Sequence, residues 1–133
     1  MTVTATSTSQ IQLIVPGEPE FLGLVRLASA GVAHRLELDH ETSDDLKLVV
    51  TEFCGRVLSL GALQLSIQWE WNEKALTVTV VAQGELESGE PEDTSDDWEE
   101  LGLLLINSLM DSVTELTSPP GVRAMKYLMP YDE

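Results

Sequence analysis

Two segments in the first half of the chain carry their apolar residues at the spacing of one helix face. The first starts at Phe21 and ends near Leu36, with apolar side chains at offsets of 0, 3, 4, 7, 11 and 15 residues. The second contributes Leu46, Val49, Val50, Phe53, Val57 and Leu60. Residues three and four apart lie on one side of an α-helix. Both segments are therefore predicted to be amphipathic helices that bury one face.

The residues around these two segments are those that begin and end helices. Pro19 stands in the first turn of the first helix, where its missing N–H leaves no hydrogen bond unmade. The sequence DHETSDD supplies several side chains that can cap the second helix, and Gly61 is placed to end it.

Two stretches have the composition of strands. Leu63–Trp71 alternates apolar and polar residues, turns at Asn72-Glu73 and returns through Leu76–Val81, which predicts a β-hairpin. Ile11–Val15 is a short β-prone run that stops at Pro16-Gly17.

The last third of the chain is predicted to hold one helix and two strands. The helix, over residues 97–111, contains LGLLLINSLM, is apolar on nearly every side and is expected to be the most buried helix. Strands follow at 112–117 and 122–128, with a turn between them. The element order β-α-α-β-β-α-β-β favours an α+β fold, a two-layer sandwich with three helices on one face of a mostly antiparallel sheet.

The chain has 133 residues, which suits one domain with a buried core. We expect this domain to span residues 11–129, after a Thr/Ser-rich, flexible N-terminus over residues 1–10. Residues 83–97 are acidic and show no periodicity, so they are predicted to be a loop within the domain.

The chain is strongly acidic. It has 7 Lys and Arg against 23 Asp and Glu, a net charge of −16 at pH 7, and residues 85–100 alone hold nine acids and no base. Such a charge repels the phosphates of DNA and RNA, so direct nucleic-acid binding is excluded as a function class. The acidic stretch is interpreted as a solvated loop, with a charged partner surface as the alternative.

Several other classes of site are disfavoured. The single cysteine, Cys54, excludes an internal disulfide, and neither His34 nor His40 has the spacing of a metal site. No metal is therefore predicted. No apolar run approaches the ~20 residues of a membrane span, and the first residues lack a secretory signal, so we expect a cytoplasmic protein that does not bind membranes.

Four segments occur in the order and at the spacing of a known family: VPGEPEFLGLVRLASAGVAHRL, DDLKLVVTEFC, LGLLLINSLMDSV and AMKYL. In this series the chain resembles the bacterial anti-sigma factor serine kinases of the histidine-kinase-like ATPase superfamily. The resemblance implies a Bergerat-type sandwich over residues 11–129, with residues 83–97 as a shortened lid. It also implies partners, because members sequester a sigma factor, use ATP and Mg²⁺ to phosphorylate a STAS-type anti-anti-sigma protein, and typically form homodimers.

The resemblance places the family's catalytic and metal positions on this sequence. The catalytic Glu falls on Glu52, and the Mg²⁺-binding Asn four residues later falls on Arg56. A guanidinium has five donors and no acceptor, so it cannot ligate a cation. Glu52 and Arg56 are expected to neutralise each other as an i, i+4 pair. The alternative is that Arg56 replaces the charge of the metal against a phosphate.

The adenine and phosphate positions also depart from the family pattern. Counting back from Gly84 puts Ala82 at the position of the adenine-binding Asp, and a slip of one residue would put Gln83 there. In the glycine-rich run that begins the third helix only Gly102 remains, behind two glutamates that would repel a triphosphate. We therefore predict a degenerate ATP site and no cofactor; the alternative retains ATP and Mg²⁺.

Partner binding does not depend on these motifs. Arg26 matches a partner-binding arginine of the family and lies off the apolar stripe; the alternative is an ordinary solvated residue. We interpret the chain as an anti-sigma-factor-like regulator of transcription that binds a sigma factor or an anti-anti-sigma protein. The alternatives are an active serine-protein kinase with an atypical site, and an acidic decoy that uses residues 85–100.

Overall fold

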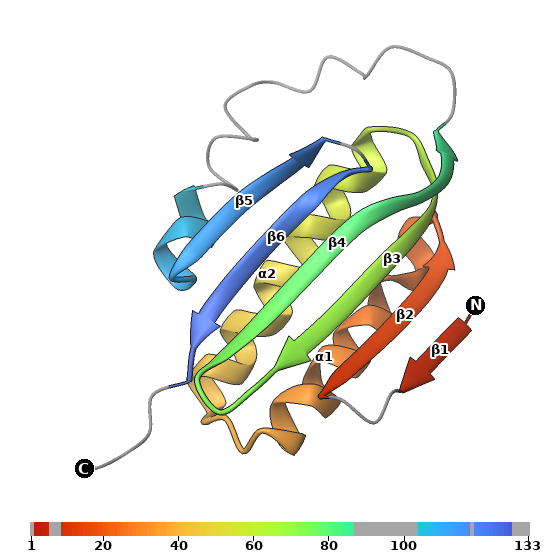
Figure 1. Cartoon of the computed structure of the whole chain (residues 1–133). Helices are drawn as coiled ribbons and strands as arrows, with labels where there is room; N and C mark the ends of the chain where they lie inside the picture. The colour runs from red at the N-terminus through yellow and green to blue at the C-terminus, as the bar shows by residue number, and fades with distance from the viewer. Residues whose placement is uncertain (1, 6–8, 87–103, 118, 129–133) are drawn as a thin grey trace.

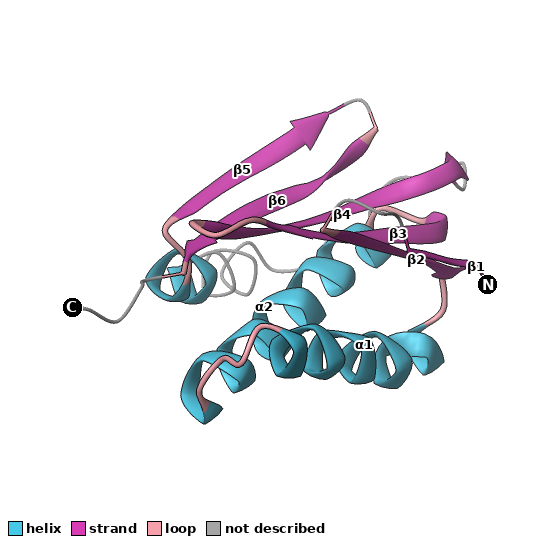
Figure 2. Ribbon diagram, turned by 60° about the horizontal axis from the view of Figure 1, so that its bottom comes forward, coloured by secondary structure: helices cyan, strands magenta, loops and turns pink. Residues whose placement is uncertain are grey.

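The computed structural model of the chain describes residues 2–5, 9–86, 104–117 and 119–128. They form an antiparallel sheet of six strands, with α1 (Leu22–Arg35) and α2 (His40–Ser59) packed on one face (Figures 1 and 2). The predicted α+β sandwich is confirmed. Among the described residues, no helix is both long enough and apolar enough to cross a membrane.

The strands follow the order β1-β2-β3-β4-β6-β5 across the sheet, and each neighbouring pair is antiparallel. Their bounds are β1 Thr2–Ala5, β2 Gln10–Pro16, β3 Ala62–Trp71, β4 Ala75–Leu86, β5 Ser112–Thr117 and β6 Pro120–Tyr127. The last described strand, β6, thus lies between β4 and β5 inside the sheet (Figure 1).

The predicted hairpin is confirmed as β3 and β4. At its turn the side-chain oxygen of Asn72 accepts hydrogen bonds from the backbone N–H groups of Lys74, at 2.7 Å, and Ala75, at 3.0 Å. An Asn side chain that bonds to the backbone two and three residues on stabilises such a turn.

The helices begin and end where the sequence predicts. A short 3₁₀ helix, η1 (Pro19–Phe21), leads into α1, and Pro19 occupies its first turn. The Asp39 side chain caps α2 by accepting a hydrogen bond from the N–H of Thr42 at 2.7 Å, and hydrogen bonds from Thr42 hold the pKa of Asp39 below its ordinary value. Gly61 follows α2 with φ 82°, the left-handed conformation typical of a helix end.

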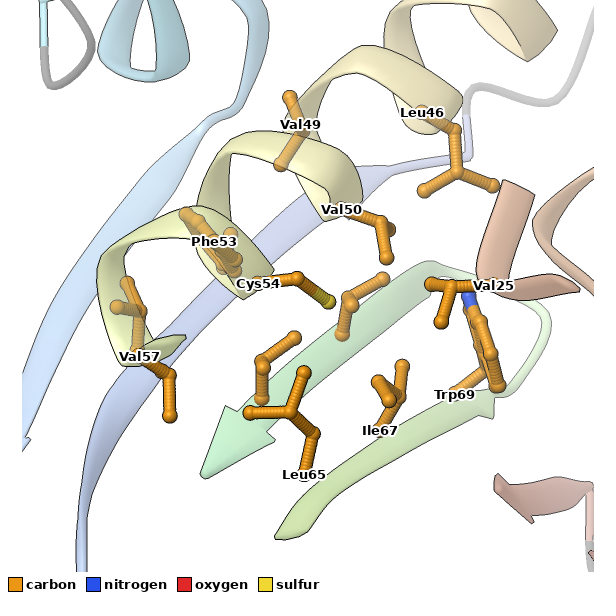
Figure 3. Packing of buried hydrophobic residues seen from close by; sticks show 14 of the residues in the cluster. Val25, Leu46, Val49, Val50, Phe53, Cys54, Val57, Leu65, Ile67 and Trp69 are labelled. Carbon is orange, nitrogen blue, oxygen red and sulfur yellow. The ribbon is translucent and has the colours of Figure 1, made fainter. Parts of the chain in front are cut away.

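The core lies between the helices and the sheet. Figure 3 shows Phe53 and Val57 of α2 above Leu65 and Ile67 of β3, with Val25 of α1 next to Trp69. All of these side chains are at most 1% exposed. Burying a side chain of this kind stabilises the fold by about 1.5–3 kcal/mol, so this layer fixes the position of α2 on the sheet.

The N-terminus differs from the prediction. Residues 2–5, expected in a flexible segment, form β1 and pair with residues 11–14 of β2. Two physical causes favour this pairing. Thr and Val are β-branched and suit a strand. Without β1, β2 would present a row of unpaired backbone groups at the edge of the sheet.

The prediction that the third helix is the most buried is wrong for its described part. Residues 104–109 are helical, but Leu104 is 67% exposed and Leu105 39%, whereas Ile106 and Met110 are buried. The helix therefore packs on the core through one face, and its exposed residues include both leucines and the polar Asn107 and Ser108. The most buried helix is α2, which contributes Leu46, Val49, Val50, Phe53, Cys54 and Val57 to the core. Residues 97–103 lie outside the described part.

Candidate functional site

Glu52 and Arg56 lie one turn apart on α2, and both are half-buried. The Arg56 guanidinium extends to β5, where its Nη2 donates to Oε1 of Glu115 at 2.7 Å and forms an ion pair. The predicted pair between Glu52 and Arg56 is therefore wrong. Arg56 instead ties α2 to β5.

The register of β5 explains this contact. Glu115 lies opposite Val122 of β6, and Val122 is buried on the helix side of the sheet. Paired residues of adjacent strands share a face, so the Glu115 side chain also points toward α2. Glu115 is 59 positions from Arg56, and no local pattern in the sequence indicates the contact.

The other terminal nitrogen of Arg56, Nη1, is buried and has no hydrogen-bond partner among the described residues. A buried, positively charged donor repels a metal ion and cannot ligate it. The described part of the chain also holds no group of three or more His, Cys, Asp and Glu side chains placed to bind a metal. These residues do not fit the Mg²⁺ that the resemblance implies.

Ala82 and Gln83 lie on opposite faces of β4. Ala82 is 4% exposed and continues the buried row of Val78 and Val80 on the helix side, whereas Gln83 is exposed. Side chains alternate between faces along a strand, so Gln83 points away from α2. A slip of one residue therefore does not restore an adenine acceptor on the helix side of the sheet.

The predicted loop begins later than residue 83. Gly84 lies within β4, which continues to Leu86, and Leu86 pairs with Ala62 of β3. The stretch that resembles the family's glycine motif thus belongs to strand β4 up to Leu86, although its pairing with β3 is irregular between Gln83 and Leu86. The rest of the predicted loop and Gly102 lie outside the described residues.

A small hollow adjoins the ion pair. It has a volume of about 160 Å³ and is lined by Arg56, Glu115 and apolar residues that include Leu60 and Leu116. Pockets for small organic ligands usually measure about 300–1,000 Å³. The hollow formed by the described residues is too small to enclose a nucleotide.

The one cysteine offers no nucleophile here. Cys54 lies on α2 between Glu52 and Arg56 in sequence but is fully buried in the core. Burial raises the pKa of its thiol to about 12, so the reactive thiolate is absent at neutral pH.

The outer side of α1 carries the predicted partner residue. Arg26 is exposed, as its place off the apolar stripe predicts. Its neighbour Leu27 is 71% exposed and is a second candidate for partner contact. Leu27 was not predicted, although its position outside the apolar stripe of the helix indicated that it would be exposed. Arginine is among the residue types enriched in protein interfaces.

Comparison with known proteins gives a consistent picture over most of the chain. The histidine kinase-like ATPase domain family matches residues 15–124. The serine-protein kinase RsbW of Bacillus velezensis is 32% identical over 142 aligned residues, which cover 93% of this chain and 89% of that protein.

Proteins of the same name from two other species are similar to this chain to the same degree. The serine-protein kinase RsbW of Halalkalibacterium halodurans is 31% identical, with 92% of this chain and 85% of that protein covered. The one from Bacillus subtilis is 32% identical, with 89% and 85% covered.

Proposed function

The chain belongs to the histidine kinase-like ATPase domain family, and we propose that within this family it is an anti-sigma-factor-like regulator that acts by binding other proteins. Its expected partner is a sigma factor or a STAS-type anti-anti-sigma protein in the cytoplasm. The RsbW serine-protein kinases, which align with about nine-tenths of the chain, support this kind of role. We further propose that residues 11–129 act as one binding module and that ATP binding and kinase activity have been lost.

The ion pair between Arg56 and Glu115 carries the proposed loss of activity. The resemblance assigns the position of Arg56 to an Mg²⁺-binding Asn. Here a cation occupies it, and an acidic residue of β5 holds that cation in place at 2.7 Å. A magnesium ion brought to this position would meet a positive charge and no oxygen ligand from residue 56.

The end of β4 supports the same proposal. The position that the resemblance assigns to the adenine-binding Asp is a buried alanine, and the neighbouring Gln83 points to the other face of the sheet. A nucleotide base would therefore find no carboxylate acceptor at residues 82 and 83. A site built to hydrogen-bond a ligand loses specificity by orders of magnitude when such a group is missing.

Calorimetric titration with ATP and Mg²⁺ tests the proposed loss. We expect no saturable heat up to about 1 mM nucleotide, a concentration at which an affinity of −4.1 kcal/mol would half-fill the site. An RsbW serine-protein kinase serves as the positive control. Micromolar binding by this chain would overturn the proposal that the ATP site is lost.

The partner-binding role is tested separately, in the absence of nucleotide. We expect the chain to bind a sigma factor or a STAS-type anti-anti-sigma protein in surface plasmon resonance, and Arg26→Glu to weaken that binding by at least about tenfold. Arg35→Glu is the matched control, because it makes the same charge change at another exposed position of α1. Equal effects of both substitutions would show that Arg26 contributes to binding only through the net charge of the chain and not through a specific contact.

An active kinase with an atypical site remains the second candidate, and Glu52 favours it. This residue keeps the catalytic position of the resemblance, is half-buried and forms no ion pair within the described residues. Transfer of labelled phosphate from ATP to an anti-anti-sigma protein would establish this activity. In that case Glu52→Gln is expected to abolish transfer, whereas Glu41→Gln on the same helix is expected to leave it intact.

A further inference from the structure

A hollow lies where the connection between α1 and α2 meets the end of β6; we call it the corner hollow. It has a volume of about 310 Å³ and is lined by residues 36–39 and Thr42 on one side and by residues 126–128 on the other. Figure 1 shows the α1–α2 connection and the end of β6 at the same end of the molecule. The hollow beside Arg56 includes Pro120, the first residue of β6, in its lining. A strand rises about 3.3 Å per residue, so the two hollows lie roughly 20 Å apart and are separate sites.

The corner hollow combines an apolar lining with exposed acidic residues. Leu36, Leu38 and Leu128 are half-buried and pack against the core. Glu37 and Asp39 also line the hollow, and both are exposed. The leucines therefore offer a surface for hydrocarbon, and the two acids offer a surface for a positive charge.

The two carboxylates are available to a ligand. Neither forms an ion pair with a described Lys or Arg. Asp39 accepts a hydrogen bond from the N–H of Thr42, but a carboxylate has about four lone-pair positions and can accept more. Lys126 is the one cation among the described residues that line the hollow, and its Nζ donates to the carbonyl oxygen of Leu109 at 2.9 Å. Two negative charges against one positive charge leave the hollow acidic.

Glu37 occupies a backbone position at which glycine is favoured. Its φ is 55°, in the left-handed region. The N–H of Glu37 donates to the carbonyl oxygen of His34 at 3.1 Å, and the N–H of Leu38 donates to that of Ala33 at 3.0 Å. Helices that end in this way usually have glycine at the left-handed residue, because a Cβ is disfavoured there. The chain thus carries a carboxylate at the corner hollow where glycine would suit the backbone better.

We propose that the corner hollow binds an arginine side chain on a basic segment of a partner protein. Charge complementarity favours a cation, because residues 37–45 hold five acids and no Lys or Arg, in a chain of net charge −16. A guanidinium has five N–H donors to offer two carboxylates, and the hydrocarbon stem of arginine packs on apolar surface. Pockets for small organic ligands usually measure about 300–1,000 Å³, so a hollow at the lower limit suits one long side chain.

This inference goes beyond the proposed function, and its test needs no nucleotide and no regulatory partner. The probe is the capped tripeptide acetyl-Gly-Arg-Gly-amide, titrated into the full ¹⁵N-labelled chain and followed by two-dimensional NMR. We expect saturable shifts of the backbone amides of residues 36–42 and 126–128, with a dissociation constant on the order of 1 mM. Replacing the arginine by citrulline, its neutral analogue, is expected to abolish these shifts. Replacing it by lysine is expected to weaken binding, because an ammonium is more strongly hydrated than a guanidinium.

Three variants separate the charge of the hollow from the stability of the fold. Glu37→Gln is expected to weaken peptide binding at least about threefold, because it removes one of the two carboxylates. Glu37→Gly is expected to weaken binding to the same extent and yet to raise the midpoint of urea denaturation, because glycine suits the left-handed backbone. Lys126→Gln is expected to tighten binding at least about twofold, because it removes a charge that repels the guanidinium. Glu18→Gln is the matched control: it removes an exposed carboxylate outside the hollow and is expected to leave the dissociation constant unchanged.

Several results would overturn the proposal. They are the absence of a saturable shift up to about ten times the expected dissociation constant, shifts centred on other residues, and equal binding of the citrulline peptide. A stronger response of the same amides to Ca²⁺ would indicate a metal site instead. A folded Lys126→Gln variant that binds the peptide less tightly would contradict the assigned charge of the ligand. ATP binding would contradict the proposed function and leave this inference intact.

Discussion

Replacing Glu115 tests whether Arg56 is held by β5 or by its neighbour on α2. We expect Glu115→Gln to lower the free energy of unfolding, because the substitution keeps the shape of the side chain and removes the charge that pairs with Arg56. Arg56 already has one buried nitrogen without a hydrogen-bond partner among the described residues, so the substitution weakens the one ion pair that those residues give it.

The geometry sets the size of the effect. Two unit charges about 4 Å apart attract by ~1 kcal/mol in water and by ~4 kcal/mol at an effective dielectric of 20. The side chains of Arg56 and Glu115 are 25% and 59% exposed, which places the pair near the aqueous limit. Measured exposed pairs contribute about 0.2–1 kcal/mol. We therefore expect a coupling energy of about 0.5–1 kcal/mol between the two residues.

A double-mutant cycle measures this coupling directly. Arg56→Met and Glu115→Gln are made singly and together, and the free energy of unfolding is obtained from urea denaturation at neutral pH. The control cycle pairs Arg56→Met with Glu52→Gln, and its coupling is expected to be near zero. Added salt should reduce the first coupling and leave the second unchanged. A coupling to Glu52 that equals or exceeds the coupling to Glu115 would refute the assignment.

Four further predictions concern burial, backbone packing and helix capping. Burial raises the pKa of Cys54 to about 12, so we expect no reaction with a disulfide reagent in the native state and full reaction after unfolding. Because the thiol ionises at lower pH in the unfolded chain, the free energy of unfolding should fall as the pH rises above 9. Gly121→Ala places a Cβ against the carbonyl oxygen of Val80 and should destabilise by about 1–3 kcal/mol in urea denaturation. Gly55→Ala meets no atom within 4 Å and should stabilise by about 0.5–1 kcal/mol. Asp39→Ala should lower the melting temperature; the pKa of Asp39 is depressed, so the difference from wild type should be full above about pH 5 and vanish as the pH falls through the folded pKa.

The parts of the fold that could be predicted are those set by local spacing. The two helical stripes and the alternating hairpin are confirmed as α1, α2 and the β3–β4 pair. Each depends on residues close together in the chain. The position of Arg26 outside the stripe likewise predicted its exposure.

The parts that could not be predicted depend on distant segments. Arg56 pairs with a residue 59 positions away, because the register of β5 and β6 turns Glu115 toward α2. The strand β1 forms because it has β2 as a neighbour, and the partial exposure of residues 104–109 depends on how little of that helix meets the core.

One feature of the site was available in the sequence and was missed. Leu76, Val78 and Val80 alternate onto the buried face of β4, and continuing the alternation puts Ala82 on that face and Gln83 on the other. The predicted strand ended at Val81, so the opposite orientation of Ala82 and Gln83 was not considered. Because β4 continues past Val81, Ala82 lies on the helix side of the sheet and Gln83 does not, a distinction that the motif alone left open.

The position of β6 between β4 and β5 constrains how the chain folds during its synthesis. This strand is synthesised after the five others, yet it must enter between β4 and β5. Until it emerges from the exit tunnel, β4 has one bare edge and β5 has no neighbouring strand to pair with. A nascent chain that stalls before residue 120 would therefore expose the unpaired edges of β4 and β5. Such intermediates are prone to aggregate and are expected to depend on chaperones that cover these edges.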